Sequence, residues 1–205
     1  MAVNLQKGQK VDLRKSDGSE LKKVMVGLGW DEAEKSSGSK KGLFGALFGG
    51  ENHRDIDCDA SAFLCVNGKI ENSDDIIYFG NLEHESGAVK HMGDNLTGEG
   101  EGDDEQIFVD LKSLPSRYDR IIFVVNIYKA RERKQHFGMI KNAFIRICDN
   151  DNNQELCRYN LSENYDNMTA MIFGEIYLRN GQWRFNAIGQ AVTDNSISEL
   201  AKRFV

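Results

Sequence analysis

The chain has 205 residues, of which 40% are hydrophobic and 28% are charged, and its formal net charge at pH 7 is -6. This apolar content excludes an intrinsically disordered chain, and the acidic balance argues against nucleic acid as a partner. The longest apolar runs have the length of strands, and the N-terminus lacks the apolar stretch of a secretory signal. We therefore expect a cytoplasmic protein with no membrane span.

Short segments of alternating or continuous apolar residues, closed by turn residues, follow one another along the chain and predict β-strands. They span residues 3–5, 10–13, 21–28, 56–66, 76–79, 88–91, 107–111, 121–128, 143–148, 155–159, 170–178 and 182–188. Asn67-Gly68 and Asn180-Gly181 predict tight hairpins, because both central positions of a type I′ turn favour positive φ. The pattern is typical of an all-β protein, and we expect an antiparallel β-sandwich forming a single domain over 1–205.

Helical patterns are few and short. Residues 113–120 predict a short helix, with Ser113 as its N-cap and Pro115 in its first turn. A C-terminal helix is predicted over 196–204, because Ser196 can cap it and apolar residues recur on one face.

Residues 33–55 interrupt the strand pattern with a loop insertion rich in Gly and Lys. The apolar residues of 43–48 lie at helical spacing beside two lysines, so contact with a membrane or a partner is one hypothesis. The other is a loop whose phenylalanines fold back on the sandwich, which the neighbouring glycines favour.

Cysteine spacing indicates no disulfide framework or zinc site. The four cysteines lack a CxxC pair and lie in apolar strand patterns: Cys58, Cys65, Cys148 and Cys157. We expect buried, reduced thiols.

The segment 94–105 carries the whole formal charge excess. It holds six acids and no base, with glycines at three alternate positions, while acids and bases are equal in number elsewhere. Neighbouring carboxylates repel one another by about 1 to a few kcal/mol, which a bound divalent cation removes. Glycines let backbone carbonyls turn inward, as calcium requires. The candidate ligands are Asp94, Asn95, Thr97, Glu99, Glu101, Asp103, Asp104 and Glu105.

The alternative for this segment is a solvated run of charges without metal. It is not an EF-hand loop, because Leu96 and Gly98 occupy two ligand positions and the flanking segments predict strands.

Asp57 and Asp59 form a second acidic feature on the strand predicted over 56–66. By alternation both project from one face, while apolar residues project from the other. We expect them to share a metal ion with the acidic segment. Asp31, at the end of another predicted strand, is either a further ligand or a turn residue.

Five motifs resemble the TerD family of tellurite-resistance and stress proteins, in the order found there. They are Gly-Leu-Gly-Trp-Asp at 27–31, Asp-Cys-Asp-Ala-Ser-Ala-Phe at 57–63, the segment 93–105, Lys-Gln-His-Phe-Gly-Met at 134–139 and Met-Ile-Phe-Gly-Glu-Ile-Tyr at 171–177. The resemblance implies a β-sandwich that binds calcium, often at two sites, and a role in tellurite resistance and stress response. The stretch 35–50 is longer than the usual connection, so the resemblance implies nothing about it.

The leading hypothesis is a calcium-binding, calcium-dependent interaction module that is not an enzyme. Its expected partners are other family members or a membrane-associated complex. The alternative is a metal-assisted hydrolase using the acidic cluster, which would need an open coordination position and a nearby base.

Overall fold

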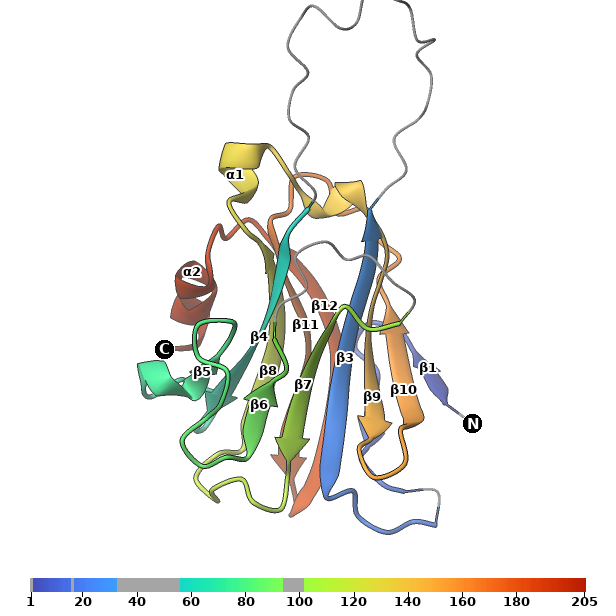
Figure 1. Cartoon of the computed structure of the whole chain (residues 1–205). Coiled ribbons are helices and arrows are strands. Elements are labelled where there is room, and N and C mark those ends of the chain that lie inside the picture. The colour runs from blue at the N-terminus through green and yellow to red at the C-terminus, as the bar shows by residue number, and fades with distance from the viewer. Residues whose placement is uncertain (1, 16, 33–55, 94–101) are drawn as a thin grey trace, which may run out of the picture.

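The computed structural model describes residues 2–15, 17–32, 56–93 and 102–205, which form two six-stranded sheets packed face to face (Figure 1). Sheet A has, in spatial order, β1 (Val3–Leu5), β10 (Gln154–Asn160), β9 (Ile140–Asp149), β3 (Lys23–Glu32), β7 (Glu105–Asp110) and β6 (Val89–His91). Sheet B has β2 (Lys10–Asp12), β12 (Gln182–Val192), β11 (Ala170–Arg179), β8 (Arg120–Ile127), β4 (Cys58–Cys65) and β5 (Ile76–Ile77). Apart from the parallel β1–β10 pair, neighbouring strands are antiparallel, so the predicted antiparallel sandwich is confirmed.

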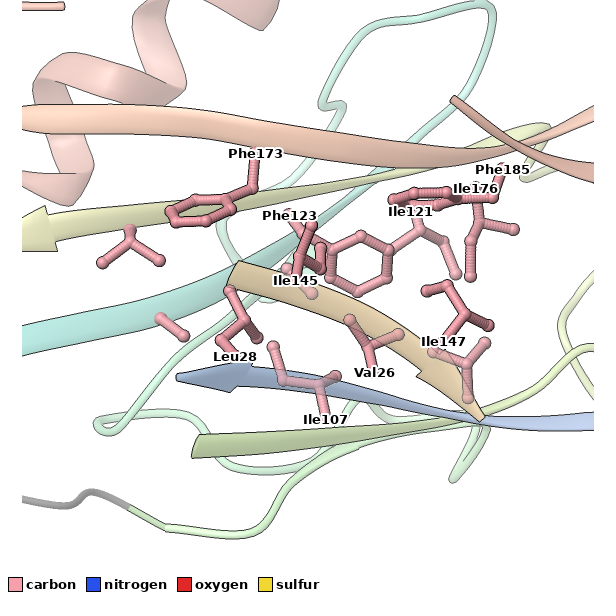
Figure 2. Packing of buried hydrophobic residues seen from close by; sticks show 14 of the residues in the cluster. Val26, Leu28, Ile107, Ile121, Phe123, Ile145, Ile147, Phe173, Ile176 and Phe185 are labelled. Atoms are coloured by element: carbon pink, nitrogen blue, oxygen red, sulfur yellow. The ribbon is translucent and has the colours of Figure 1, made fainter. Parts of the chain in front are cut away.

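Alternate residues of each strand meet between the sheets and form the main core. Val26 and Leu28 of sheet A lie there with Phe123 and Phe173 of sheet B (Figure 2). Each such side chain, fully buried, contributes about 1.5–3 kcal/mol.

Apolar side chains also cover part of the outer face of sheet B, so polar residues of β4 on that face can be buried. Phe63 of β4 belongs to a second apolar cluster with Leu200 of helix α2 (Ile197–Ala201). The Phe63 ring also packs edge-on against Phe204, with ring centroids 6.0 Å apart. Every residue of β4 is therefore buried, including the polar ones.

Local signals in the sequence predicted turns well. Asn67 and Gly68 have φ of 53° and 78°, and Asn180 and Gly181 have φ of 52° and 76°, as both hairpins require. The C-terminal helix is confirmed as α2 followed by the 3-10 turn η3 (Lys202–Phe204), with the Ser196 side chain accepting from the Glu199 backbone N–H.

The helix predicted over 113–120 was wrong: residues 113–119 form turns and irregular backbone, and Arg120 begins β8. The Asp110 carboxylate accepts hydrogen bonds from the backbone N–H groups of Lys112 and Ser113, which favours a turn over a helix. Tyr118, within this stretch, is buried in the main core.

Other short helices were not predicted. They are η1 (Ser73–Asp75), α1 (Ala130–Arg133) and η2 (Phe137–Met139). The insertion 33–55 lies outside the described residues, and no described helix is long and apolar enough to cross a membrane.

Candidate functional site

Asp57 immediately precedes β4 and is tied to the segment that follows β8. Its carbonyl accepts from the Tyr128 backbone N–H at 2.8 Å, and its Oδ2 accepts from Arg133 Nη1 at 3.2 Å. The Arg133 guanidinium also lies over the Tyr128 ring, 5.0 Å from the centroid. One cation therefore links the Asp57 carboxylate to an exposed aromatic ring.

Asp59, two residues on, lies on the outer face of sheet B. Cys58 and Ala60 point into the main core, so alternation places Asp59 and Ser61 on the opposite face, as the sequence predicted for Asp59. Asn126 of β8 is the register partner of Asp59, and its Nδ2 donates to Asp59 Oδ2 at 3.3 Å.

Three oxygen atoms on this face are buried without a hydrogen-bond partner among the described residues: Asp57 Oδ1, Ser61 Oγ and Asn126 Oδ1. Ser61 is 0% exposed, Asn126 3% and Asp59 4%. A buried oxygen atom without a donor costs about 1–3 kcal/mol. Because the Asn126 amide nitrogen faces Asp59, a flipped amide would set its oxygen against a carboxylate. The arrangement therefore has capacity for a ligand that supplies positive charge.

Asp103, on the sheet A side, has another partner. Arg146 of β9 donates to both of its carboxylate oxygens, from Nε at 2.6 Å and from Nη2 at 2.9 Å. Gln106 Nε2 donates to Oδ2 at 3.1 Å, and the Asp103 side chain is 0% exposed. These three hydrogen bonds involve both carboxylate oxygens and indicate a structural role.

Asp104 immediately precedes β7 and lies beside β3. Its Oδ2 accepts from the Trp30 backbone N–H at 2.7 Å. Burial raises the pKa of the Asp104 carboxyl, and the charges of Asp31 and Asp103 raise it further, against the opposing effect of the Trp30 hydrogen bond. Asp31 is exposed, and its Oδ2 accepts from Asn142 Nδ2 at 2.7 Å. Its charge acts on the Asp104 carboxyl, so the two carboxylates are neighbours.

Glu105 is turned towards sheet B and buried. Its Oε2 accepts from the Ala60 backbone N–H at 2.7 Å and lies 3.2 Å from His91 Nε2. The predicted ligand at this position thus makes a contact between the two sheets.

Carboxylates from both sheets lie near enough to the Cys58 thiol to affect its pKa. Burial raises its pKa well above the ordinary value, and the charges of Asp59, Glu105, Asp57 and Asp104 raise it further. The structure therefore gathers four of the eleven predicted ligands in one region, with Asp31 beside Asp104.

Not every predicted ligand can be placed. Asp94, Asn95, Thr97, Glu99 and Glu101 lie outside the described residues. Within the described ranges, no group of three or more His, Cys, Asp or Glu side chains has the geometry to hold a metal ion. A site here needs neutral oxygen donors as well as carboxylates.

Sequence reasoning missed Asn126, Arg133, Arg146 and His91 as parts of this region. Only Asn126 could have been noticed in the sequence, because it is the one polar residue inside the apolar run 121–127. Arg133 and Arg146 reach the region from segments distant in sequence, and His91 lies three residues before the acidic segment without a spacing that indicates its contact.

The thiols behave as predicted. All four cysteines are free and buried, and burial raises the pKa of Cys65 and of Cys157 to about 12. Protonated thiols are poor nucleophiles and metal ligands at neutral pH.

Comparison with known proteins decides the family, because the TerD domain model matches residues 1–204. The chain belongs to the TerD family. The stress response protein SCP2 of Bacillus subtilis (strain 168) is 48% identical over 205 residues, covering 100% of both chains. The tellurium resistance protein TerD of Serratia marcescens is 44% identical over 203 residues, covering 98% of this chain and 97% of its own.

The TerD fold also recurs in solved structures. A crystal structure titled as a homologue of telluride resistance protein (TerD) from Streptomyces coelicolor A3(2) has a TM-score of 0.63 at 17% identity, covering 90% of this chain and 98% of its own. A second structure, of a protein of unknown function, has a TM-score of 0.65 at 22% identity, covering 88% and 95%. At these identities the likeness concerns the fold alone.

Proposed function

We propose that this TerD-family chain is a cytoplasmic stress-response protein that binds calcium between Asp57, Asp59 and Asn126. The single observation that carries the proposal is the set of three buried oxygen atoms without a hydrogen-bond donor beside the Asp59 carboxylate. Calcium binds six to eight oxygen atoms and accepts carboxylate, amide and hydroxyl donors together.

The charge balance supports a cation at this place. The charges of four carboxylates act on the Cys58 thiol, and Arg133 offsets part of their mutual repulsion by pairing with Asp57. A divalent ion offsets this repulsion. The acidic residues of 94–101 remain predicted ligands, while Asp103 is left out of the proposed set because Arg146 binds both of its oxygens.

We propose binding and not catalysis. A catalytic metal needs a coordination position open to substrate. The donor oxygens of Ser61 and Asn126 are buried, which leaves a substrate little access to an ion held between them. The hydrolase hypothesis has no comparable observation in its favour.

Tyr128 is the exposed residue whose position would depend on whether the ion is bound, so a protein partner that contacts it would bind in a calcium-dependent way. It is 40% exposed, its N–H is bonded to the Asp57 carbonyl, and its ring lies under Arg133. An ion at Asp57 competes with Arg133 for the carboxylate and so changes how this ring is held. Tyrosine and arginine are common at the centres of interfaces. We expect the partner to be another TerD-family chain or a component of a membrane-associated complex.

The test is thermal melting of metal-stripped protein with calcium, with wild type, Asp59→Asn and Asp74→Asn compared. At one hundred times the dissociation constant, an ion that binds only the native state adds about 2.7 kcal/mol, or roughly 5–10 °C for a chain of this size. Asp59→Asn should lose most of this gain. Asp74→Asn, which removes an exposed carboxylate on η1, should keep it. Equal gains in both variants would contradict the proposed site.

A further inference from the structure

One short turn, residues 129–134, gathers positive charge on a chain that is acidic as a whole. This basic turn contains α1 and carries four bases and one acid, whereas the net charge of the chain is -6. The bases are Lys129, Arg131, Arg133 and Lys134, and the acid is Glu132. In Figure 1, α1 lies at the end of the sandwich opposite to the start of β3.

The backbone at both ends of α1 has the left-handed conformation. Lys129 and Lys134, its N-cap and C-cap, have φ of 53° and 54°. The other non-glycine residues with positive φ in the described ranges are all asparagine: Asn67, Asn142, Asn153, Asn167 and Asn180. Asparagine tolerates this conformation better than lysine does. Because lysine costs stability at these two positions, its presence there indicates a use for the two ammonium groups.

The basic turn holds its cations on a fixed backbone. The Arg133 N–H donates to the Lys129 carbonyl at 2.9 Å, and the Gln135 N–H donates to the Ala130 carbonyl at 2.8 Å. Ala130 and Gln135 are both buried and anchor the turn to the sandwich. A surface that is already ordered loses little conformational freedom when a partner binds.

Only part of the positive charge of the basic turn is paired within the chain. Arg133 pairs with Asp57, and Lys129 Nζ lies 3.8 Å from an exposed carboxylate of its own turn. Arg131 and Lys134 are exposed, and neither forms an ion pair with a described residue. These two cations, and Lys129 in part, are available to carboxylates from another molecule.

We propose that Tyr128 and the basic turn form a docking surface for an acidic segment of a partner protein. The Tyr128 ring is 40% exposed and lies between two cations, with Lys129 Nζ 5.4 Å and the Arg133 guanidinium 5.0 Å from its centroid. An aromatic ring beside arginine is typical of the centre of a protein interface, and the surrounding charges select an acidic partner.

The size of the surface favours a peptide chain over a membrane. The four residues of α1 span about 6 Å, which matches a short peptide segment and offers a lipid bilayer little contact. The inference rests on the protein-binding role proposed for Tyr128, but not on a bound calcium ion.

The experiment measures the fluorescence anisotropy of a labelled peptide with the sequence of residues 94–105, titrated with metal-stripped full chain in calcium-free buffer. This peptide carries six acids and no base. We expect wild type to bind it, and added salt to weaken the binding because the cations are exposed. Lys129→Asn/Lys134→Asn should weaken binding by about fivefold or more, as the loss of two exposed ion pairs does. Its melting temperature should equal or exceed that of wild type, because asparagine fits the left-handed backbone.

The matched control is Lys22→Asn/Lys112→Asn, which removes the same charge at the other end of the sandwich. Both lysines are exposed, and the Lys22 carbonyl accepts from the Leu111 N–H, so they lie close together. This variant should bind the peptide within about twofold of wild type, because distant surface charges are screened.

Each outcome bears on the proposed surface. If the Lys129→Asn/Lys134→Asn variant binds like wild type, or the control weakens binding equally, the basic turn is not the docking surface. If the Lys129→Asn/Lys134→Asn variant melts at a lower temperature, Arg131→Gln decides, and unchanged binding by Arg131→Gln overturns the proposal. Binding of phosphatidylserine vesicles but not of the peptide would identify a membrane as the partner instead. A wild type that does not bind the peptide overturns the docking surface alone, since the calcium melting test is separate.

Discussion

Arg146 of β9 holds both carboxylate oxygens of Asp103, and this ion pair lies directly against the backbone of Gly27 on β3. A Cβ atom at Gly27 would lie 2.2 Å from Asp103 Oδ1. The first glycine of the Gly-Leu-Gly-Trp-Asp motif therefore makes room for a partly buried ion pair just before the start of β7.

Gly27→Ala should expel the Asp103 carboxylate and destabilise the fold by about 1–3 kcal/mol, the usual cost of overpacking. The measurement is urea denaturation of Gly27→Ala, Asp103→Ala and the double variant. The double variant should lose less than the sum of the single losses, because the methyl group then has space. Strict additivity would mean that the two side chains do not meet.

Asp104→Asn should raise the melting temperature of metal-free protein at pH 7 and reduce its gain from calcium. The pKa of Asp104 is raised by burial and by nearby carboxylates, so the folded state favours the neutral carboxyl. Its ionisation costs stability as the pH rises through the raised pKa. The advantage of Asn should therefore disappear below the ordinary value of 3.8.

Melting scans at pH 7 and pH 3.5, with and without calcium, check this prediction. If the variant is less stable than wild type without metal at pH 7, the ionised Asp104 carboxylate does not destabilise the fold and the prediction is wrong.

Tyr118→Phe should destabilise the protein at neutral pH by about 1–3 kcal/mol, the cost of leaving a buried charged group short of a donor. Tyr118 Oη donates to Asp75 Oδ1 at 2.5 Å, and His84 Nε2 lies 3.1 Å from the same hydroxyl. Burial raises the pKa of Asp75, but the hydrogen bonds from Tyr118, the Asn72 backbone and His84 outweigh it, and the net pKa is lowered.

The sign of this shift sets the pH window for the Tyr118 test. A lowered carboxyl pKa gives stability above the ordinary value of 3.8 that is lost as the pH falls through the lowered pKa. Denaturation curves at pH 7 and pH 3 should show a larger difference between wild type and Tyr118→Phe at pH 7. A constant difference would mean that Asp75 is not the group involved.

The parts of the fold that depend on neighbouring residues were predictable from the sequence. Positive-φ turns at Asn-Gly pairs and the capped C-terminal helix follow from local chemistry, and both are confirmed. The parallel pairing of β1 with β10 joins residues about 150 positions apart, and no local pattern specifies it. The error at 113–120 arose because Asp110, outside the window, accepts the N–H groups of the turn.

In the candidate site, too, only the features that depend on neighbouring residues were predictable from the sequence. Alternation predicted that Asp59 faces away from Cys58 and Ala60, because that depends only on strand geometry. The partners of the acidic residues depend on register between sheets. Nothing in the sequence indicates that Arg146 binds Asp103 or that Glu105 turns inward to Ala60.

Crystals grown with calcium test the central claim most directly, through an anomalous difference map recorded at long wavelength. The account predicts a calcium peak on the outer face of sheet B, within coordination distance of Asp57, Asp59 and the side-chain oxygen of Asn126, at about 2.3–2.6 Å. Asp59→Asn crystals grown in the same way should lose the peak. A peak elsewhere on the chain, or none in wild-type crystals, would contradict the account.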